Sequence, residues 1–339
     1  MITMKQAIDK VVRGNDLTRC EAEDVMSIML GGKATQAQLG SFLTTLRLKG
    51  ETIDEIVGCA TVMQAKAEHI APHVQGNYID LVGTGGDGTN TFNISTTSAF
   101  VAAAAGVPIA KHGNRAISSK SGAADVLEAL GVNIMLEAPM VQSCIEEVGI
   151  GFMFAQIFNK SMKNVGQARN DMGIRTIFNI LGPISNPSNA KAALIGVFSP
   201  DLTEPIAKAM QEMGVERAMV VSGCDGMDEI TLTGKTTVAE IKDGTVSCYE
   251  LDPVDYGFEY VTSDELKGGQ GSENAEFTKE ILKGELGAKR NVVLLNAGAA
   301  IYVGGRADSL AEGIELAKTV IDKGLALNKL NELVEFTNR

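Results

Sequence analysis

The sequence predicts an α/β protein with a mostly parallel sheet flanked by helices, together with a small all-helical N-terminal domain. Two patterns support this prediction. Apolar residues recur at a spacing of about 3.6 throughout residues 1–71, as they do in amphipathic helices. From Asn77 onward, short apolar stretches alternate with helical patterns, which is typical of parallel strands joined by crossover helices. A chain of 339 residues, 45% of them hydrophobic, can form two unequal domains.

The N-terminal domain, residues 1–71, is predicted to contain four short helices joined by short loops. Asp16, Thr18, Thr35 and Thr52 have the side-chain oxygens that N-cap positions favour. The expected helices are Met4–Arg13, Thr18–Gly31, Thr35–Lys49 and Ile53–Ile70. Core packing explains any single apolar residue of this bundle, but one group together suggests a homodimer contact: Ile28, Met29, Leu30, Phe42, Leu43 and Leu46.

The second domain, residues 72–339, is predicted to alternate strands and helices. The expected strands are Ile79–Val82, Val107–Ala110, Gly151–Phe154, Lys191–Gly196, Arg217–Ser222 and Asn291–Leu295. Alternating Thr, Val and Ile over Lys235–Asp252 indicate a peripheral hairpin. Helical patterns over Lys160–Met172 and Thr176–Leu181 suggest that residues of about 160–185 rejoin the small domain. The last expected helices are Ala275–Leu286, Ala297–Val303 and Ser309–Lys323.

A glycine-rich turn follows the first strand of this domain and indicates a phosphate site. Gly83, Gly85, Gly86 and Gly88 let the backbone turn tightly and approach a ligand without a Cβ clash. The hydroxyl-rich residues 95–98 then begin an alanine-rich helix, whose free N–H groups and dipole favour an anion. The following strand ends at the sequence KHGNR, residues 111–115, which adds positive charge beside the turn.

The same turn matches the G-x-G-x-x-G pattern of dinucleotide-binding folds, but its surroundings argue against that alternative. A dinucleotide site requires an acidic residue about 20 positions further on, where this chain has Lys111 and His112. Asp87, inside the turn, would also repel the pyrophosphate of a dinucleotide. Because the pattern alone has low specificity, we favour a phosphate site of another kind.

Two neighbouring carboxylates, Asp228 and Glu229, follow another apolar strand and suggest a magnesium site. Loops after strands lie at the carboxyl edge of an open α/β sheet, where ligands bind. Mg²⁺ takes one or two carboxylates and completes its shell with water and substrate phosphate. A solvated acidic turn is the simpler interpretation of an isolated pair, and the nearby phosphate turn favours the metal.

Two further features have both an ordinary and a functional interpretation. The sequence SSKSG, residues 118–122, begins an expected helix over Ala123–Leu130 and fits a simple cap as well as a second phosphate contact. Arg169 is of a type that usually lies on the surface, but near an anion site an arginine can bind a carboxylate in a bidentate fork.

Composition argues against several classes of protein. A net charge of −12 argues against nucleic-acid binding, which requires a basic face. The sequence has no apolar run of membrane-spanning length and no signal-peptide pattern in MITMKQAIDK, so we expect a cytoplasmic protein. The five cysteines lack C-x-x-C spacing, which argues against disulfides and zinc. With three histidines and no Ser-His-Asp or P-loop motif, the sequence favours chemistry by positioning and electrostatics.

Five motifs, in this order and spacing, resemble the anthranilate phosphoribosyltransferase family: GTGGDGTNTFNIST, KHGNR, SSKSG, RTIFNILGPISNP and DGMDE. The resemblance covers nearly the whole chain. It implies transfer of the phosphoribosyl group from 5-phosphoribosyl diphosphate (PRPP) to the amine of anthranilate, with release of pyrophosphate, in tryptophan biosynthesis. It also implies two Mg²⁺ ions per subunit and a homodimer.

The resemblance further implies roles for individual residues. PRPP would be bound by the glycine turn and later residues, namely Gly83, Gly85, Gly86, Asp87, Thr91, Asn93, Ser95, Thr96, Lys111 and Ser119. Magnesium would be held by Ser95, Asp228 and Glu229. Anthranilate would contact Gly83, His112, Asn114 and Arg169, with Arg169 at its carboxylate. We assign no residue as acid or base, because an aromatic amine is already neutral and nucleophilic near pH 7.

The chain departs from the family pattern at two places near the expected acceptor path. Many members have histidines where this chain has Phe158-Asn159 and Ser222, so the sequence leaves open whether anthranilate is the only acceptor. A pyrimidine nucleoside phosphorylase shares the architecture, but GTGGDG and DGMDE favour the diphosphate substrate. A non-catalytic relative that binds nucleotides or nucleic acid is the other alternative, and the net charge of −12 and the intact acidic pair argue against it.

Overall fold

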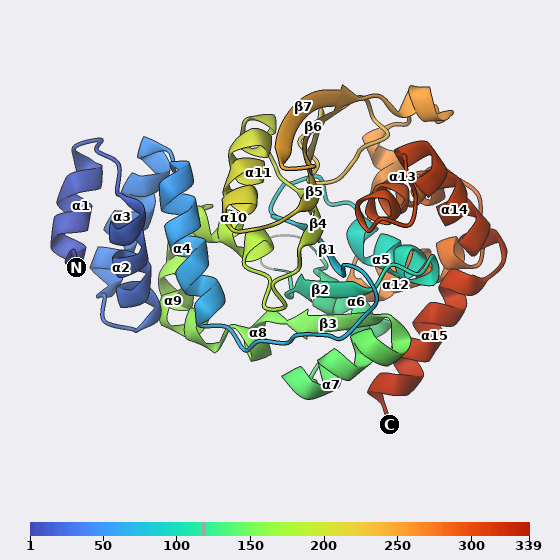
Figure 1. Cartoon of the computed structure of the whole chain (residues 1–339), viewed down its shortest axis with the longest axis horizontal. Coiled ribbons are helices and arrows are strands. Elements are labelled where there is room, and N and C mark those ends of the chain that lie inside the picture. Colours follow the sequence, from blue (N-terminus) through green and yellow to red (C-terminus); the bar gives the residue numbers. More distant parts are fainter. Residues whose placement is uncertain (117–119) are drawn as a thin grey trace.

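The computed structural model describes residues 1–116 and 120–339, with N-terminal helices, a central sheet and C-terminal helices following one another along the molecule (Figure 1). The N-terminal helices are α1 (Met4–Val12), α2 (Arg19–Leu30), α3 (Gln36–Lys49) and α4 (Ile53–Ala65). The prediction of four helices is confirmed, although α4 ends at Ala65 rather than Ile70.

Each of these helices begins with a threonine that caps its first turn. Thr3, Thr18, Thr35 and Thr52 each accept a hydrogen bond from a backbone N–H three residues later, where a Gln or Glu side chain reciprocates. The predicted caps at Thr18, Thr35 and Thr52 are therefore confirmed. The prediction of a cap at Asp16 is wrong, because its carboxylate accepts a hydrogen bond from Lys49 instead.

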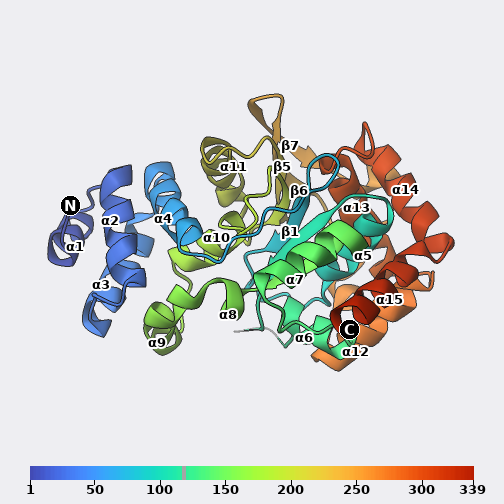
Figure 2. The same cartoon turned by 60° about the horizontal axis from the view of Figure 1, so that its bottom comes forward.

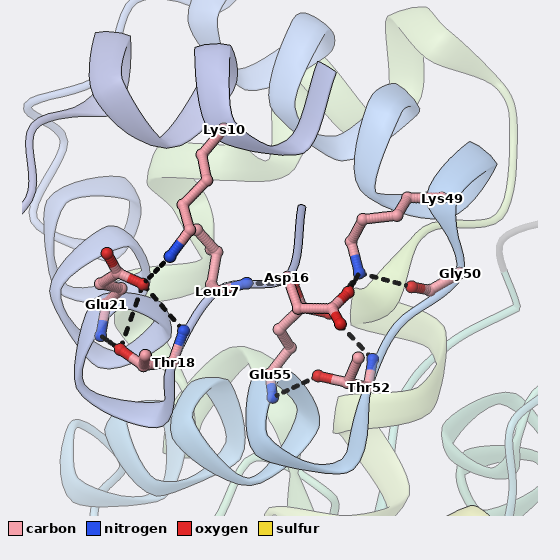
Figure 3. A network of polar contacts seen from close by, with 9 residues as sticks. All are labelled: Lys10, Asp16, Leu17, Thr18, Glu21, Lys49, Gly50, Thr52 and Glu55. Carbon is pink, nitrogen blue, oxygen red and sulfur yellow. Dashed lines mark hydrogen bonds and ion pairs between the residues drawn. The ribbon is translucent and has the colours of Figure 1, made fainter. Parts of the chain in front are cut away.

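Lys49 forms the centre of a polar network within the bundle (Figure 3). Its side chain is only 7% exposed, and Nζ donates to Asp16 Oδ1 at 2.7 Å and to Glu55 Oε2 at 2.9 Å. Glu55 is fully buried and also accepts hydrogen bonds from the backbone N–H groups of Leu17 at 2.9 Å and Thr52 at 2.8 Å. This network ties the end of α3 to the loops that precede α2 and α4.

Two helices from the middle of the chain cover the N-terminal bundle. After β3, α9 (Lys163–Met172) packs against α2 and α3, and α10 (Ile177–Ile184) packs against α3 and α4. The apolar residues expected at a dimer contact are enclosed within one chain: Met29, Leu30, Phe42, Leu43 and Leu46 are at most 2% exposed, and Ile28 is partly buried. That reason for a dimer surface is therefore wrong, because this core, shared with α9 and α10, encloses the residues.

The central sheet has seven strands in the order β3-β2-β1-β4-β5-β6-β7. The first five pair in parallel, and β5, β6 and β7 pair antiparallel. Their bounds are Ile79–Gly83 (β1), Ile109–Gly113 (β2), Ile150–Phe154 (β3), Ala192–Gly196 (β4), Arg217–Gly223 (β5), Thr236–Lys242 (β6) and Thr245–Leu251 (β7). The mostly parallel sheet and its edge hairpin are both confirmed.

The strand expected at Asn291–Leu295 is wrong, because these residues lie within the buried helix α13 (Ala288–Val303). Every side chain from Val292 to Val303 is buried in this helix, so its sequence shows no polar face. A short continuous apolar run does not distinguish a buried strand from a buried helix, and here it continues into the helix expected at Ala297–Val303.

The two faces of the sheet belong to two hydrophobic cores. On one face, Leu81, Leu194 and Val221 pack with α5 (Ile94–Ala104), α13 and α14 (Leu310–Asp322). On the other face, Ala193 and Ile195 share a core with the N-terminal bundle, α9, α10 and α11 (Thr203–Glu212). Strand residues alternate between the faces, so neighbouring positions contribute to different cores.

The remaining helices are short or lie toward the C-terminal end. They are α6 (Ala123–Ala129), α7 (Ala138–Ser143), the π-helix η1 (Cys144–Val148), α8 (Ala155–Phe158), α12 (Gly271–Leu282) and α15 (Leu325–Thr337), with 3₁₀ turns η2 (Lys160–Met162), η3 (Pro200–Leu202), η4 (Pro253–Tyr256) and η5 (Ser263–Leu266). Figure 2 shows α5, α6 and α12–α15 gathered at the opposite end from α1–α3. Across residues 1–116 and 120–339, the helices are too short or too polar to span a membrane.

Candidate functional site

The parallel strands bring several of the predicted site residues to one edge of the sheet. β1 continues into the glycine turn, residues 83–88, and β2 contains Lys111 and His112 at its end. The loop after β5 carries Asp228 and Glu229. Because β1, β2, β4 and β5 run in parallel, these segments all lie at or after the carboxyl ends of their strands.

Glycine is required at two strand ends because Asp228 lies directly against them. A Cβ atom on Gly83 would lie 2.3 Å from Asp228 Oδ2. A Cβ atom on Gly196, at the end of β4, would lie 1.5 Å from the Asp228 carbonyl oxygen. The missing side chains therefore allow the acidic loop to contact the ends of both strands.

The glycine turn presents backbone N–H groups as an anion site requires. Gly85 and Gly86 both have a φ of 68°, a left-handed conformation that glycine adopts without a Cβ penalty. The Gly85 N–H donates to Asp228 Oδ2 at 2.6 Å. The N–H groups of Gly86 and Asp87 have no acceptor among residues 1–116 and 120–339. Consecutive unpaired N–H groups of this kind form a concave binding site for an anion.

The acidic pair is partly buried against the start of α5. Glu229 Oε1 accepts a hydrogen bond from the Ser95 N–H at 3.1 Å. Loss of surrounding water and repulsion by Asp87 raise the pKa of Asp228. Loss of water and repulsion by Asp228 likewise raise the pKa of Glu229. Each carboxylate would therefore be stabilised by a cation.

These crowded carboxylates fit the coordination chemistry of magnesium. Among the described residues, no group of three or more His, Cys, Asp or Glu side chains forms a preformed metal site. Mg²⁺ does not need one, because it commonly takes one or two carboxylates and fills its shell with water and substrate phosphate. Asp228 and Glu229 lie beside the unpaired N–H groups of the glycine turn, where such a phosphate would bind.

Lys111 places a buried ammonium next to this pair. Its side chain is 2% exposed, and Nζ donates to the Leu81 carbonyl and lies 3.4 Å from Ser95 Oγ. Burial lowers the pKa of Lys111, although the charges of Asp80, Glu229 and Asp228 oppose this change. The structure thus brings Lys111, Ser95 and the acidic pair together.

The residues at the start of α5 are tied to other loops. Asn93 is the N-cap residue but makes no side-chain cap; its Nδ2 donates to the Ser121 carbonyl at 3.3 Å, and its Oδ1 accepts from Asn274 Nδ2 at 2.8 Å. Thr91 forms an isolated bridge with Lys267. Thr96 is 1% exposed, and its hydroxyl has no partner in the described part of the chain.

His112 is held neutral in a buried polar chain. Its ring Nε2 accepts a hydrogen bond from Asn159 Nδ2 at 3.0 Å, and its backbone N–H donates to Asp80 Oδ1 at 3.1 Å. Burial lowers the pKa of His112 to about 4, so the ring carries no charge near pH 7. Burial raises the pKa of Asp80 to about 6, while Asn186 donates to its second oxygen at 2.6 Å.

Arg169, in α9, carries a cation without a carboxylate partner among the described residues. Its half-buried guanidinium lies 5.2 Å from the centre of the Phe178 ring, and no described residue offers it a carboxylate or another hydrogen-bond acceptor. Loss of surrounding water lowers the pKa of Arg169. An arginine in this state is suited to bind a carboxylate that a ligand supplies.

The structure gives less information about the other positions that the sequence analysis named. Asn114 is exposed and accepts a hydrogen bond from the Arg115 N–H at 2.8 Å. Ser119 lies outside the described residues. Phe158 and Ser222 are each 1% exposed, so both are buried.

Comparison with known proteins matches two family models to the chain. The helical bundle domain of a glycosyl transferase family matches residues 5–67, and the a/b domain of a glycosyl transferase family matches residues 75–327. The anthranilate phosphoribosyltransferase of Acetivibrio thermocellus is 57% identical over 99% of this chain and 97% of its own. The chain belongs to the anthranilate phosphoribosyltransferase family.

Solved structures of the anthranilate phosphoribosyltransferase family have the same fold. The Thermus thermophilus enzyme superposes with a TM-score of 0.93 at 41% identity, covering 98% of this chain and 99% of its own. The Saccharomyces cerevisiae enzyme in complex with PRPP and Mg has a TM-score of 0.90 at 27% identity, covering 99% and 98%. A further structure of the yeast enzyme contains 4-fluoroanthranilate, with a TM-score of 0.88 at 26% identity and coverage of 99% of each chain.

Two residues of this candidate site, Asp80 and Arg175, have no role that the sequence alone predicts. Asp80 is an acid in an otherwise apolar strand, and this interruption of the apolar pattern is the one feature of the sequence that marks it. Arg175 follows Arg169 closely, and its Nη2 donates to the Gly86 carbonyl. Their partners lie 32 and 89 residues away along the chain, so local spacing does not reveal either contact.

Proposed function

We propose that this protein transfers the phosphoribosyl group of PRPP to the amine of anthranilate, giving N-(5-phosphoribosyl)anthranilate and pyrophosphate in tryptophan biosynthesis. The proposal rests on one observation: the glycine turn, the acidic pair and Lys111 meet at the end of β1 in a chain 57% identical to an enzyme of this name. Its two proposed domains are residues 1–71, joined by about 160–185, and residues 72–339.

The donor would bind along the glycine turn and the start of α5. Gly83, Gly85, Gly86 and Asp87 would surround the diphosphate, since the N–H groups of Gly86 and Asp87 lack an acceptor among the described residues. The other proposed contacts with PRPP are Thr91, Asn93, Ser95, Thr96, Lys111 and Ser119. The dipole of α5 would favour the same negative charge.

Magnesium would be held by Ser95, Asp228 and Glu229, and we propose two ions per subunit. When bound, magnesium neutralises the charge that develops on the departing pyrophosphate. Backbone N–H groups would orient these ligands: those of Gly85 and Ser95 donate hydrogen bonds to Asp228 and Glu229, respectively. Fixed N–H donors and charges stabilise a transition state without reorganising, which accounts for much of the catalysis expected here.

The acceptor would lie between the turn and the helical domain. Arg169 would bind the carboxylate of anthranilate, with Gly83, His112 and Asn114 around the ring and amine. The amine attacks the ribose carbon as the bond to pyrophosphate breaks, and it then loses a proton. His112 is neutral but accepts a hydrogen bond from Asn159, so it is not free to act as a base. An aromatic amine of low basicity needs no strong base.

We further propose that the protein is a cytoplasmic homodimer that binds neither nucleic acid nor membranes. Its net charge of −12 supports the absence of nucleic-acid binding. Sedimentation velocity would test the dimer, and cell fractionation would test the compartment.

Loss of anthranilate fluorescence provides a direct test of the reaction. Purified protein is mixed with anthranilate, PRPP and Mg²⁺, and controls omit PRPP or replace Mg²⁺ with a chelator. We expect fluorescence loss only in the complete mixture, with release of one pyrophosphate per anthranilate consumed. No loss, together with phosphate-dependent cleavage of thymidine, would instead support a pyrimidine nucleoside phosphorylase. Binding of PRPP without transfer would point to another acceptor.

A further inference from the structure

Arg175 joins the glycine turn to the helical domain. It lies in the short segment between α9 and α10, and its Nη2 donates to the carbonyl of Gly86. The guanidinium carbon lies 4.0 Å from the centre of the Phe198 ring, in the loop after β4. The backbone carbonyl of Arg175 accepts a hydrogen bond from Arg47 Nη1 of α3 at 2.9 Å. One residue thus contacts the bundle, the sheet edge and the turn.

The contact with Gly86 has a consequence for the turn itself. In a planar trans peptide, the carbonyl and the following N–H point in opposite directions. When Arg175 holds the Gly86 carbonyl, the N–H of Asp87 is therefore directed to the opposite side of the turn. This N–H is one of the two that lack an acceptor in the described part of the chain.

The turn needs such a restraint because its glycines are conformationally free. Gly85 and Gly86 have φ values that glycine adopts as readily as others, so the isolated turn would populate several arrangements of its N–H groups. The Phe198 ring supports the guanidinium from one face. Arg175 has no carboxylate partner among residues 1–116 and 120–339, so its charge remains available to the turn.

We infer that Arg175 is a positioning residue for the donor: it orients the Gly86–Asp87 peptide for the diphosphate of PRPP and links this turn to the segment that carries Arg169. The inference rests on the proposed function, because it assigns the diphosphate to the turn. It predicts that losing the Arg175 side chain weakens PRPP binding while acceptor binding at saturating PRPP is little changed.

Calorimetric titration with PRPP and Mg²⁺, without acceptor, tests the inference separately from turnover. For Arg175→Ala we expect PRPP binding to weaken by about 10- to 100-fold, the range for losing one charge-assisted hydrogen bond. The anthranilate KM at saturating PRPP should change by less than about threefold. The matched control is Arg306→Ala, which removes a 2.8 Å bond from Nε to the carbonyl of Gly106, another glycine of positive φ, outside this site.

A second variant distinguishes positioning from direct contact with phosphate. Phe198→Leu removes the ring that supports the guanidinium but keeps the charge. Positioning predicts PRPP binding about two- to fivefold weaker, the range for losing one exposed cation–π contact. Unchanged PRPP binding in Phe198→Leu alongside a large loss in Arg175→Ala would overturn positioning in favour of a direct phosphate contact.

Other outcomes also decide the question. PRPP binding in Arg175→Ala equal to that of Arg306→Ala would overturn the inference while leaving the proposed function intact. A rise in anthranilate KM as large as the loss of PRPP binding would overturn its restriction to the donor. Failure of the wild-type protein to bind PRPP would overturn the proposed function and this inference with it. Equal unfolding midpoints of wild type and variants without ligand would show that a lost fold is not the cause.

Discussion

Adding one methyl group at Gly83 should displace the proposed metal site. A Cβ atom there would lie 2.3 Å from Asp228 Oδ2 and 2.7 Å from Asp228 Cγ, whereas ordinary contacts begin at 3.4 Å. In Gly83→Ala the Asp228 carboxylate must therefore move by about 1 Å, which is enough to lower a catalytic rate roughly 100-fold. The obstacle is a side chain that can turn away, so we expect a stability loss of only about 1–3 kcal/mol.

The assay measures fluorescence loss of anthranilate over a range of Mg²⁺ concentrations. We expect Gly83→Ala to lower kcat about 100-fold and to raise the half-saturating Mg²⁺ concentration. The control is Gly166→Ala in α9, where an added Cβ meets nothing within 4 Å, so activity should stay within about twofold of wild type. If Gly83→Ala keeps its activity within about threefold with an unchanged Mg²⁺ requirement, the assigned role of Asp228 is refuted.

Further predictions concern charge. Asp228→Asn with Glu229→Gln should abolish magnesium-dependent turnover while the unfolding midpoint stays unchanged or rises, since two crowded charges are removed; unchanged turnover would contradict the metal assignment. In the wild type, burial raises both pKa values, so protons compete with Mg²⁺, and the half-saturating Mg²⁺ concentration should rise as the pH falls from about 8 to about 6. Arg169→Ala should raise the anthranilate KM about 10- to 100-fold with a nearly constant PRPP KM; equal effects on both would remove its acceptor-specific role. Lys49→Met leaves the fully buried Glu55 without its cation and should lower the free energy of unfolding in urea by about 3–5 kcal/mol; a loss below about 1 kcal/mol would show that the pair is not needed.

Local signals predicted most of the fold. Thr18, Thr35 and Thr52 marked helix starts correctly because a cap depends on residues only three positions apart. Asp16 also has a side-chain oxygen that can cap a helix, but it pairs with Lys49 instead. Because Lys49 lies 33 residues away along the chain, the local sequence does not show this ion pair. At Asn291–Leu295 burial on all sides removed the periodicity that separates helix from strand.

The sequence indicated part of the candidate site through the residue types at strand ends. Glycines at Gly83 and Gly85, and acids at Asp228 and Glu229, follow strands at the edge where α/β ligands bind. The contacts of His112 with Asn159 and of Arg175 with Gly86 could not be predicted, because they join segments 47 and 89 residues apart. Such contacts depend on how the folded elements pack, which spacing along the chain does not encode.

The helices that pack together in the N-terminal bundle are not consecutive along the chain, and this has a consequence for the synthesis of the protein. α1–α4 emerge from the ribosome first, but α9 and α10, which pack against them in a shared core, end only at Ile184, about 120 residues after α4. At about 5–20 residues per second, the nascent bundle waits roughly 6–24 s with an uncovered apolar face. Chaperones that hold exposed apolar chains therefore have an opportunity to bind during this interval, before β4–β7 of the sheet exist.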